Sequence, residues 1–188
     1  MRKLITLCLL ATLPALYGCV AAVVGGAAAG GYLVGEDRRA ASTLTEDQAI
    51  EFRVGPRISD KAANAHVNAT AYNRLVLLTG EVPSAEAKAE IEKVVREIPN
   101  VRGIYNELVV GPSTAMTVRA NDAYVTSKVK ARFVDARKFN PVHVKVVTED
   151  STVYLMGIVK PQEATDATEL ARTTSGVRRV VRLFEVQG

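Results

Sequence analysis

The sequence is poor in the residues that most often carry catalysis or hold metal ions. Its 188 residues include two cysteines and two histidines, His66 and His143, and neither histidine is accompanied by a cysteine or a clustered set of carboxylates. No glycine-rich phosphate loop follows a strand, and no nucleophile elbow is present. These absences predict a protein that is not an enzyme, with no catalytic residues, no cofactor and no metal site. The two histidines are expected at strand edges.

The first residues have the pattern of an export signal. Arg2 and Lys3 precede an uncharged run from Leu4 to Gly18, which matches a positive n-region followed by a hydrophobic h-region. The uncharged run continues to Gly35, long enough to span a bilayer. An uncleaved signal anchor is therefore the alternative to a cleaved leader.

The residues that follow the leader bear on how the chain is anchored. Leu16-Tyr17-Gly18-Cys19 resembles the lipobox of bacterial lipoproteins, although Tyr17 departs from the small or β-branched residue usual there. The resemblance implies that residues 1–18 are a signal peptide and that Cys19 carries acyl chains such as palmitate, each buried methylene contributing about 0.8 kcal/mol. Cys8 leaves with the leader, so no thiol remains. Val20 after the cysteine implies an outer-membrane protein facing the periplasm.

The rest of the chain contains an internal repeat. The segment Val76–Val82 aligns with Val153–Val159 at an offset of 77 residues, and the match continues with one residue dropped. We therefore expect a Gly/Ala-rich tether over 19–44, a first domain over 45–111, a linker over 112–120 and a second domain over 121–188. The later matches place Val101, Ile104, Leu108 and Val110 on Val177, Val180, Phe184 and Val186.

Each copy reads as helix, strand, strand, helix, strand. In the second copy, alternating valines over 142–146 and the alternation from Val153 flank the polar turn 149–151, which predicts an antiparallel hairpin. Pro161 begins a helix, and a strand over 180–186 pairs in parallel. The predicted fold class is α+β, two tandem αββαβ sandwiches, each a three-stranded mixed sheet with two helices on one face. The other face is also apolar and is expected to pack the copies together or against a partner: Leu75, Leu77, Val147, Tyr154, Met156 and Ile158.

The first helix of the second copy has two distinct stripes. Asp122 is a candidate N-cap, and Val125, Val129 and Phe133 recur every four residues as a core-facing stripe. The same spacing places Tyr124, Lys128 and Arg132 on a neighbouring, solvent-facing side. This side is either the solvated face of an ordinary core helix or a surface that meets an anionic partner.

These features together resemble a known family. A helix, a hairpin ending in a Val-x-Leu-x-Gly-x-Val core, an Ala-rich helix and a strand after Gly176-Val177 are similar to the BON domain (bacterial OsmY and nodulation). Two such domains behind a lipobox resemble the dual-BON lipoproteins of the outer membrane, and the resemblance covers nearly all of the mature chain.

The resemblance implies a phospholipid-binding protein of the periplasm. It implies that the second domain binds anionic lipids such as phosphatidylglycerol and cardiolipin through its first helix, and that the protein supports outer-membrane integrity and can gather at the division site. Tyr124 stands at the place of an aromatic residue that enters the bilayer interface. The lipid-binding residues expected on this basis are Asp122, Tyr124, Val125, Ser127, Lys128, Val129, Lys130 and Arg132.

Two features of the residues agree with this assignment. Residues 46–110 hold 8 Lys and Arg against 10 Asp and Glu, whereas residues 121–187 hold 11 against 8, so only the second copy is basic and suited to anionic headgroups. The corresponding helix of the first copy, Ala49 to Ile58, has Ala49 in place of Tyr124 and contains Gly55-Pro56, which is expected to break or kink it.

The alternative function is an interaction scaffold, in which Tyr124, Val125 and the apolar sheet faces bind an envelope assembly factor or protease. Arg178, Arg179 and Arg182 form a second basic cluster, either a solvated strand edge or a second lipid contact. The periplasmic location implied for the protein argues against a nucleic acid partner for this cluster.

Overall fold

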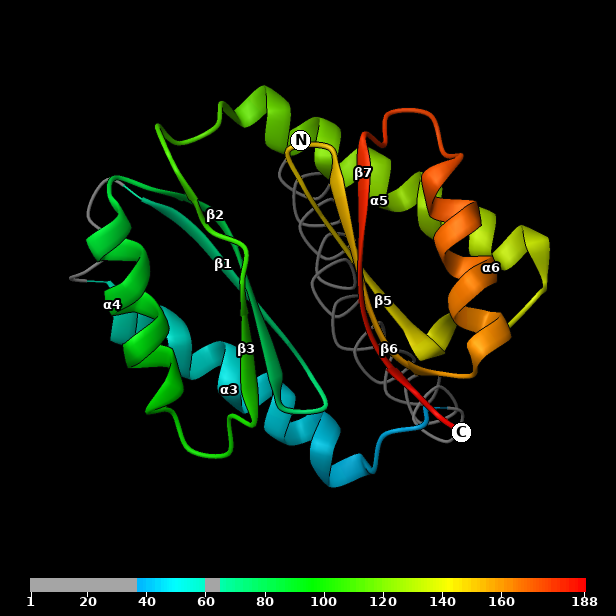
Figure 1. The fold of residues 1–188 in the computed structure, drawn as a ribbon, viewed down its shortest axis with the longest axis horizontal. Helices are drawn as coiled ribbons and strands as arrows, with labels where there is room; N and C mark the ends of the chain where they lie inside the picture. Colours follow the sequence, from blue (N-terminus) through cyan, green and yellow to red (C-terminus); the bar gives the residue numbers. More distant parts are fainter. Residues whose placement is uncertain (1–36, 60–64) are drawn as a thin grey trace, which may run out of the picture. The chain divides into compact units, whose positions relative to one another are not determined.

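The computed structural model describes residues 37–59 and 65–188, shown in Figure 1, and residues 38–188 form one compact unit. The predicted signal peptide, Cys19 and most of the tether lie outside the described residues. Within the described residues, no helix is long and apolar enough to cross a membrane.

The first repeat runs from α3 (Ala41–Ile58) to β4 (Val109–Val110). Strand β1 pairs antiparallel with β2, and β3 and β4 both pair parallel with β2. The last strand of this repeat is predicted as continuous but forms two pieces, β3 and β4. Between them, Leu108 leaves the strand and enters the core, where it is 2% exposed. The elements between are β1 (His66–Tyr72), β2 (Leu75–Val82), α4 (Ala85–Arg96) and β3 (Gly103–Asn106).

The second repeat has the predicted order and pairing. Strand β5 pairs antiparallel with β6, and β6 pairs parallel with β7. Val142, predicted in a strand, instead lies in a short 3-10 helix, where Pro141 follows the capping side chain of Asn140. The elements are α5 (Met116–Ala136), η2 (Pro141–His143), β5 (Val144–Glu149), β6 (Thr152–Val159), α6 (Pro161–Arg172) and β7 (Arg179–Val186).

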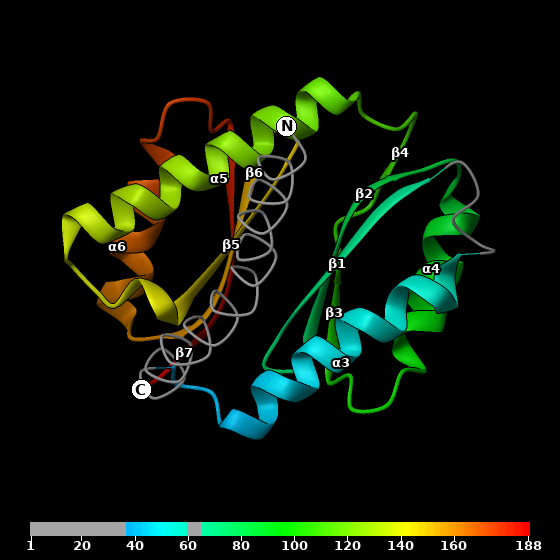
Figure 2. The same cartoon turned by 180° about the vertical axis from the view of Figure 1, so that it is seen from behind.

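Each sheet is covered by its own two helices on one face. Helices α5 and α6 lie against the sheet β5–β7 (Figure 1), and α3 and α4 lie against the sheet β1–β3 (Figure 2). The helices contribute the buried stripe at every third or fourth position and the strands contribute every second residue. The second core contains Val125, Val129, Phe133, Val153, Leu155, Ala167 and Ala171, and the first contains Ile50, Val54, Ile58, Val76, Leu78, Ile91 and Val95.

The opposite sheet faces pack the two repeats together, as predicted. A third apolar cluster draws residues from both copies, with Tyr72 and Leu77 from the first and Tyr154, Met156 and Leu183 from the second. The hydroxyl of Tyr72 donates to the carbonyl of His143 at 3.3 Å. Much of the apolar sheet surface available to a partner in the scaffold alternative is therefore already covered.

Two helix boundaries differ from the sequence prediction. Helix α5 begins at Met116, so Asp122 lies inside the helix and is not its N-cap. Helix α3 begins at Ala41, within the predicted tether, and continues to Ile58 with Pro56 inside it, so the predicted break at Gly55-Pro56 is wrong. Pro56 lies near the helix end, where loss of one backbone hydrogen bond is offset by burial of Val54 and Ile58 in the core.

Arg38, at the start of the compact unit, is tied to the second repeat. Its guanidinium donates to both carboxylate oxygens of Glu163, at 2.5 and 2.8 Å, and to the carbonyl of Ile158 at 2.9 Å. Glu163 also accepts the backbone N–H of Lys160, the residue before α6, at 2.7 Å. The hydrogen bond from Arg38 lowers the pKa of Glu163.

Candidate functional site: helix α5

The inner face of α5 is fixed in the second core. Val125 and Val129 are 0% exposed. Asp122 is 4% exposed and accepts the backbone N–H groups of Asp150 and Ser151, both at 2.9 Å. Those residues have positive φ in the β5–β6 turn, so Asp122 holds a strained turn against the helix. Asp122, Val125 and Val129 therefore have almost no surface with which to contact lipid, which corrects that part of the sequence prediction.

The same turn is built in the same way in the first repeat. Asp47, in α3, accepts the backbone N–H groups of Asn73 and Arg74 at 2.8 and 2.7 Å, and both of those residues have positive φ. The aspartate is thus a structural part of the repeat.

The outer face of α5 is also apolar. Three large side chains project from it, with Met116 74% exposed, Tyr124 61% and Val134 59%. They lie on the side opposite the buried stripe. The exposed residues around them are small: Ala120, Ala123, Ser127 and Ala131.

Cations flank this outer face on both sides. Lys130 is exposed on one side. On the other side, the Nζ of Lys128 lies 4.7 Å from the ring centroid of Tyr124 and donates to the carbonyl of Ser175. We define the outer face of α5 as Met116, Ala120, Tyr124, Ser127, Lys128, Lys130, Ala131 and Val134.

Arg132, predicted as a lipid contact, is engaged at the end of α6. Its Nη1 donates to the carbonyl of Leu170 at 2.8 Å and lies 2.9 and 3.0 Å from the hydroxyls of Thr173 and Thr174. A cation at a helix C-terminus satisfies terminal carbonyls and complements the helix dipole. Arg132 therefore joins α5 to α6.

We expect Arg132→Ala to lower the free energy of unfolding by about 1–2 kcal/mol, because it removes a charge-assisted contact with the α6 carbonyls. Urea unfolding measures this loss. Lys130→Ala, at an exposed position of the same helix, is the control and should change stability by less than about 0.5 kcal/mol. Equal stability of the two variants would contradict a joining role for Arg132.

Sequence reasoning missed Met116 and Val134. The spacing that reveals them, Met116, Ala120, Tyr124 and then Ala131 and Val134, is helical. An N-cap at Asp122 would place Met116 and Ala120 before the helix, whereas α5 begins at Met116.

A second group of polar side chains lies where the two repeats meet. His66 from β1, Glu81 from β2 and Glu149 from β5 offer ligand atoms that all lie within 4.8 Å of one another. The sequence prediction that no clustered carboxylate accompanies His66 is therefore wrong, because residues 15 and 83 positions away are brought to it by strand pairing and by packing of the repeats.

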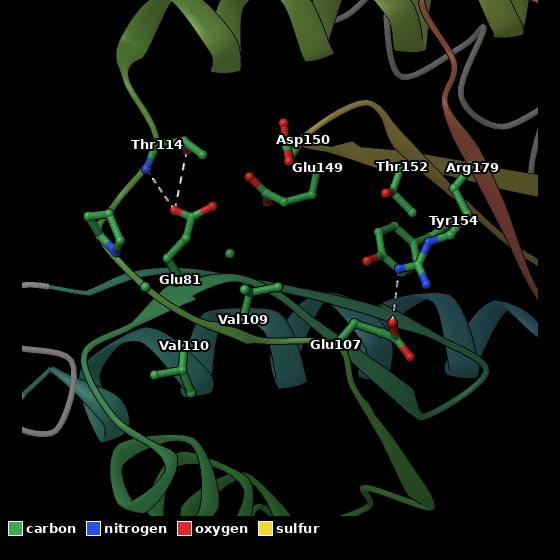
Figure 3. A pocket seen from close by; sticks show the side chains of 13 residues that line it. Glu81, Glu107, Val109, Val110, Thr114, Glu149, Asp150, Thr152, Tyr154 and Arg179 are labelled. Atoms are coloured by element: carbon green, nitrogen blue, oxygen red, sulfur yellow. Dashed lines mark hydrogen bonds and ion pairs between the residues drawn. The ribbon is translucent and has the colours of Figure 1, made fainter.

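A cavity of about 480 Å³ adjoins this group (Figure 3). The carboxylates of Glu81 and Glu149 face it from opposite repeats, and Glu107 pairs with Arg179 at 3.7 Å on another part of the wall. Burial raises the pKa of Tyr154, which also lines the cavity.

Comparison with known proteins agrees with this architecture. The family model of the BON domain matches residues 46–112 and 121–188. The chain belongs to the BON-domain family. The α+β fold with two tandem BON domains, predicted from the sequence, is thereby confirmed.

Two relatives extend the comparison. The outer membrane lipoprotein DolP of Haemophilus influenzae is 36% identical over 90% of this chain and 89% of its own length. The 21 kDa hemolysin of Actinobacillus pleuropneumoniae is 31% identical over 79% of this chain and 78% of its own length. Neither name is that of an enzyme. The similarity to DolP places this BON protein in the outer membrane, as the resemblance at Val20 implies.

Among solved structures, CdsD, a structural protein of the type III secretion system of Chlamydia trachomatis, matches 77% of this chain and 92% of that chain, at 11% identity and a TM-score of 0.31. A similarity of this size supports no argument about function.

Proposed function

We propose that this BON protein is anchored through acyl chains on Cys19 to the periplasmic side of the outer membrane and binds anionic phospholipids through the outer face of α5. In this way it supports the integrity of the envelope, including at the division site. The observation that carries the proposal is that α5 is apolar on two opposite faces, only one of which is buried in the domain.

The chemistry of the outer face suits a bilayer interface. Tyr124 combines an apolar ring with a polar hydroxyl and is the kind of residue that sits at headgroup level. Met116 and Val134 lie before and after it along the helix and supply apolar area that water now covers. Lys128 and Lys130 stand beside the apolar residues, where each cation near an anionic surface contributes about 1 kcal/mol.

Binding of vesicles by the acyl-free fragment 36–188 tests the proposal. We expect the wild-type fragment to float with phosphatidylglycerol vesicles, less so as salt rises, and not with phosphatidylcholine vesicles. The variant Tyr124→Ala with Lys130→Glu should bind about 100-fold more weakly, because it removes an interfacial ring and reverses a charge. Neither side chain is buried, so the fold should be preserved.

The matched control is Phe52→Ala, which removes an 81% exposed aromatic from the corresponding helix of the first repeat. It should bind vesicles as the wild type does. Flotation that ignores lipid charge, or that Phe52→Ala weakens as much as the α5 variant, would contradict the proposal. Absence of flotation would favour the protein-scaffold alternative, in which the outer face of α5 contacts an envelope protein.

A further inference from the structure

The group formed by His66, Glu81 and Glu149 lies at the boundary of the two repeats, where both glutamates are buried and His66 is partly buried. Glu81 is 7% exposed and Glu149 is 9% exposed. The Nδ1 of His66 is buried and has no hydrogen-bond partner among the described residues, although two carboxylates stand close to it. A buried polar atom without a partner is costly unless something else satisfies it.

The two distances from His66 are close to those between the ligands of a metal site. The Nδ1 of His66 lies 3.4 Å from Oε2 of Glu81 and 3.7 Å from Oε1 of Glu149. In a tetrahedral zinc site with bonds of about 2.0–2.1 Å, neighbouring ligand atoms are about 3.3 Å apart. Small side-chain movements would therefore bring all three atoms to bonding distance from one ion.

The charge around the group favours a cation. Two buried carboxylates within 4.8 Å of each other repel, and among the described residues neither forms an ion pair with a lysine or arginine. The adjoining cavity is lined by four carboxylates. Glu107 pairs with Arg179 and Asp150 pairs with Arg178, whereas Glu81 and Glu149 have no such pairing among the described residues. A cation entering from solvent would be attracted along this path.

We propose that His66, Glu81 and Glu149 bind one Zn²⁺ ion. An imidazole nitrogen with two carboxylates is a set that zinc accepts, whereas Mg²⁺ and Ca²⁺ prefer oxygen ligands alone. Three protein ligands leave the fourth position to water from the cavity. The site joins β1 and β2 of the first BON domain to β5 of the second, so the ion crosslinks the two domains.

Surrounding side chains already orient the ligands. Thr114 donates its N–H to Oε2 of Glu81 at 2.9 Å, and Asn68 donates to Oε2 of Glu149 at 3.0 Å. Asn68 also lies 3.3 Å from Nε2 of His66. When zinc takes Nδ1, Nε2 carries the proton. A turn of the Asn68 amide that offers its oxygen to Nε2 would then exchange the hydrogen bond to Glu149 for one from His66.

Calorimetry of the full chain in detergent, stripped of metal with a chelator that is then removed, tests the proposal. Titration with ZnCl₂ should show one site per chain, and MgCl₂ should show none at the same concentrations. His66→Ala and Glu149→Gln should each lower zinc affinity about 100-fold or more. His143→Ala, the same change at the equivalent place of the second repeat, should leave it unchanged.

A second measurement separates ligation from folding. At a hundredfold excess over its Kd, zinc should raise the Tm of the wild type by about 5–10 °C and that of Glu149→Gln by far less. Glu149→Gln keeps the size of the side chain, so it remains decisive if His66→Ala folds poorly. The proposal is overturned if the wild type binds no zinc, if Mg²⁺ binds as well, or if zinc binding survives in Glu149→Gln.

Discussion

Gly80→Ala is expected to unfold the first repeat, with a loss of about 4 kcal/mol in the free energy of unfolding. Gly80 is the glycine of the Val-x-Leu-x-Gly-x-Val core and has φ +111°, a value that other residues rarely adopt. A Cβ there would lie 1.9 Å from the carbonyl oxygen of His66 on the paired strand β1. Backbone strain and overpacking both contribute to the loss of stability, because neither strand can move without disturbing the core.

The repeat supplies an internal comparison and the chain supplies a control. At Gly157, the equivalent position, a Cβ would lie 2.4 Å from the carbonyl of His143, so Gly157→Ala should also be severely destabilising. Gly55→Ala, in α3, meets nothing within 4 Å and should stabilise by about 0.5–1 kcal/mol. Urea unfolding of all three variants measures these changes in the free energy of unfolding. Wild-type stability in Gly80→Ala would show that β1 and β2 do not approach as described.

Asp122→Ala should cost about 4 kcal/mol and weaken lipid binding together with stability. The substitution leaves two backbone N–H groups without their acceptor, those of exposed Asp150 and buried Ser151. Hydrogen bonds to a charged group contribute about 1.5–3 kcal/mol each. The turn would loosen from α5, and the outer face of the helix would lose its fixed orientation.

Asp122→Asn and Asp135→Ala are the matched variants. The amide of Asn keeps one acceptor oxygen, so about half of the loss should be recovered. Asp135 is exposed near the end of the same helix, and its removal should change stability by less than about 0.5 kcal/mol. Combined urea unfolding and vesicle flotation would contradict this account if Asp122→Ala bound lipid more weakly without being destabilised.

Local periodicity was sufficient to predict most of the fold. The spacing of Val125, Val129 and Phe133 identified the buried face of α5, and alternation along 144–159 identified the hairpin β5–β6. Both patterns depend on residues within one element, which the sequence shows directly. The repeat added the domain organisation, because two copies that align with one residue dropped are expected to share one architecture.

The candidate sites were less predictable, because they depend on pairs far apart in the chain. The carboxylate of Asp122 was interpreted as a cap on the adjacent helix, whereas its partners are 28 and 29 residues later. The guanidinium of Arg132 bonds a carbonyl 38 residues later. His66 and Glu149 meet only because the two sheets pack together. The periodicity of residues within one helix or strand cannot predict such contacts between distant parts of the chain.

The tie between Arg38 and Glu163 would link the proposed acyl anchor to the proposed lipid-binding helix. Eighteen residues lie between Cys19 and Arg38, so the nineteen steps along the chain span at most about 63–68 Å even when fully extended. Because Arg38 is held on the domain that carries α5, this length bounds how far that domain can travel from its anchor. If Cys19 is acylated, the length of the tether sets the effective concentration of membrane lipid near α5. A weak and readily reversible affinity of the helix for anionic headgroups is then sufficient, and shortening or lengthening the tether would tune occupancy without changing any contact.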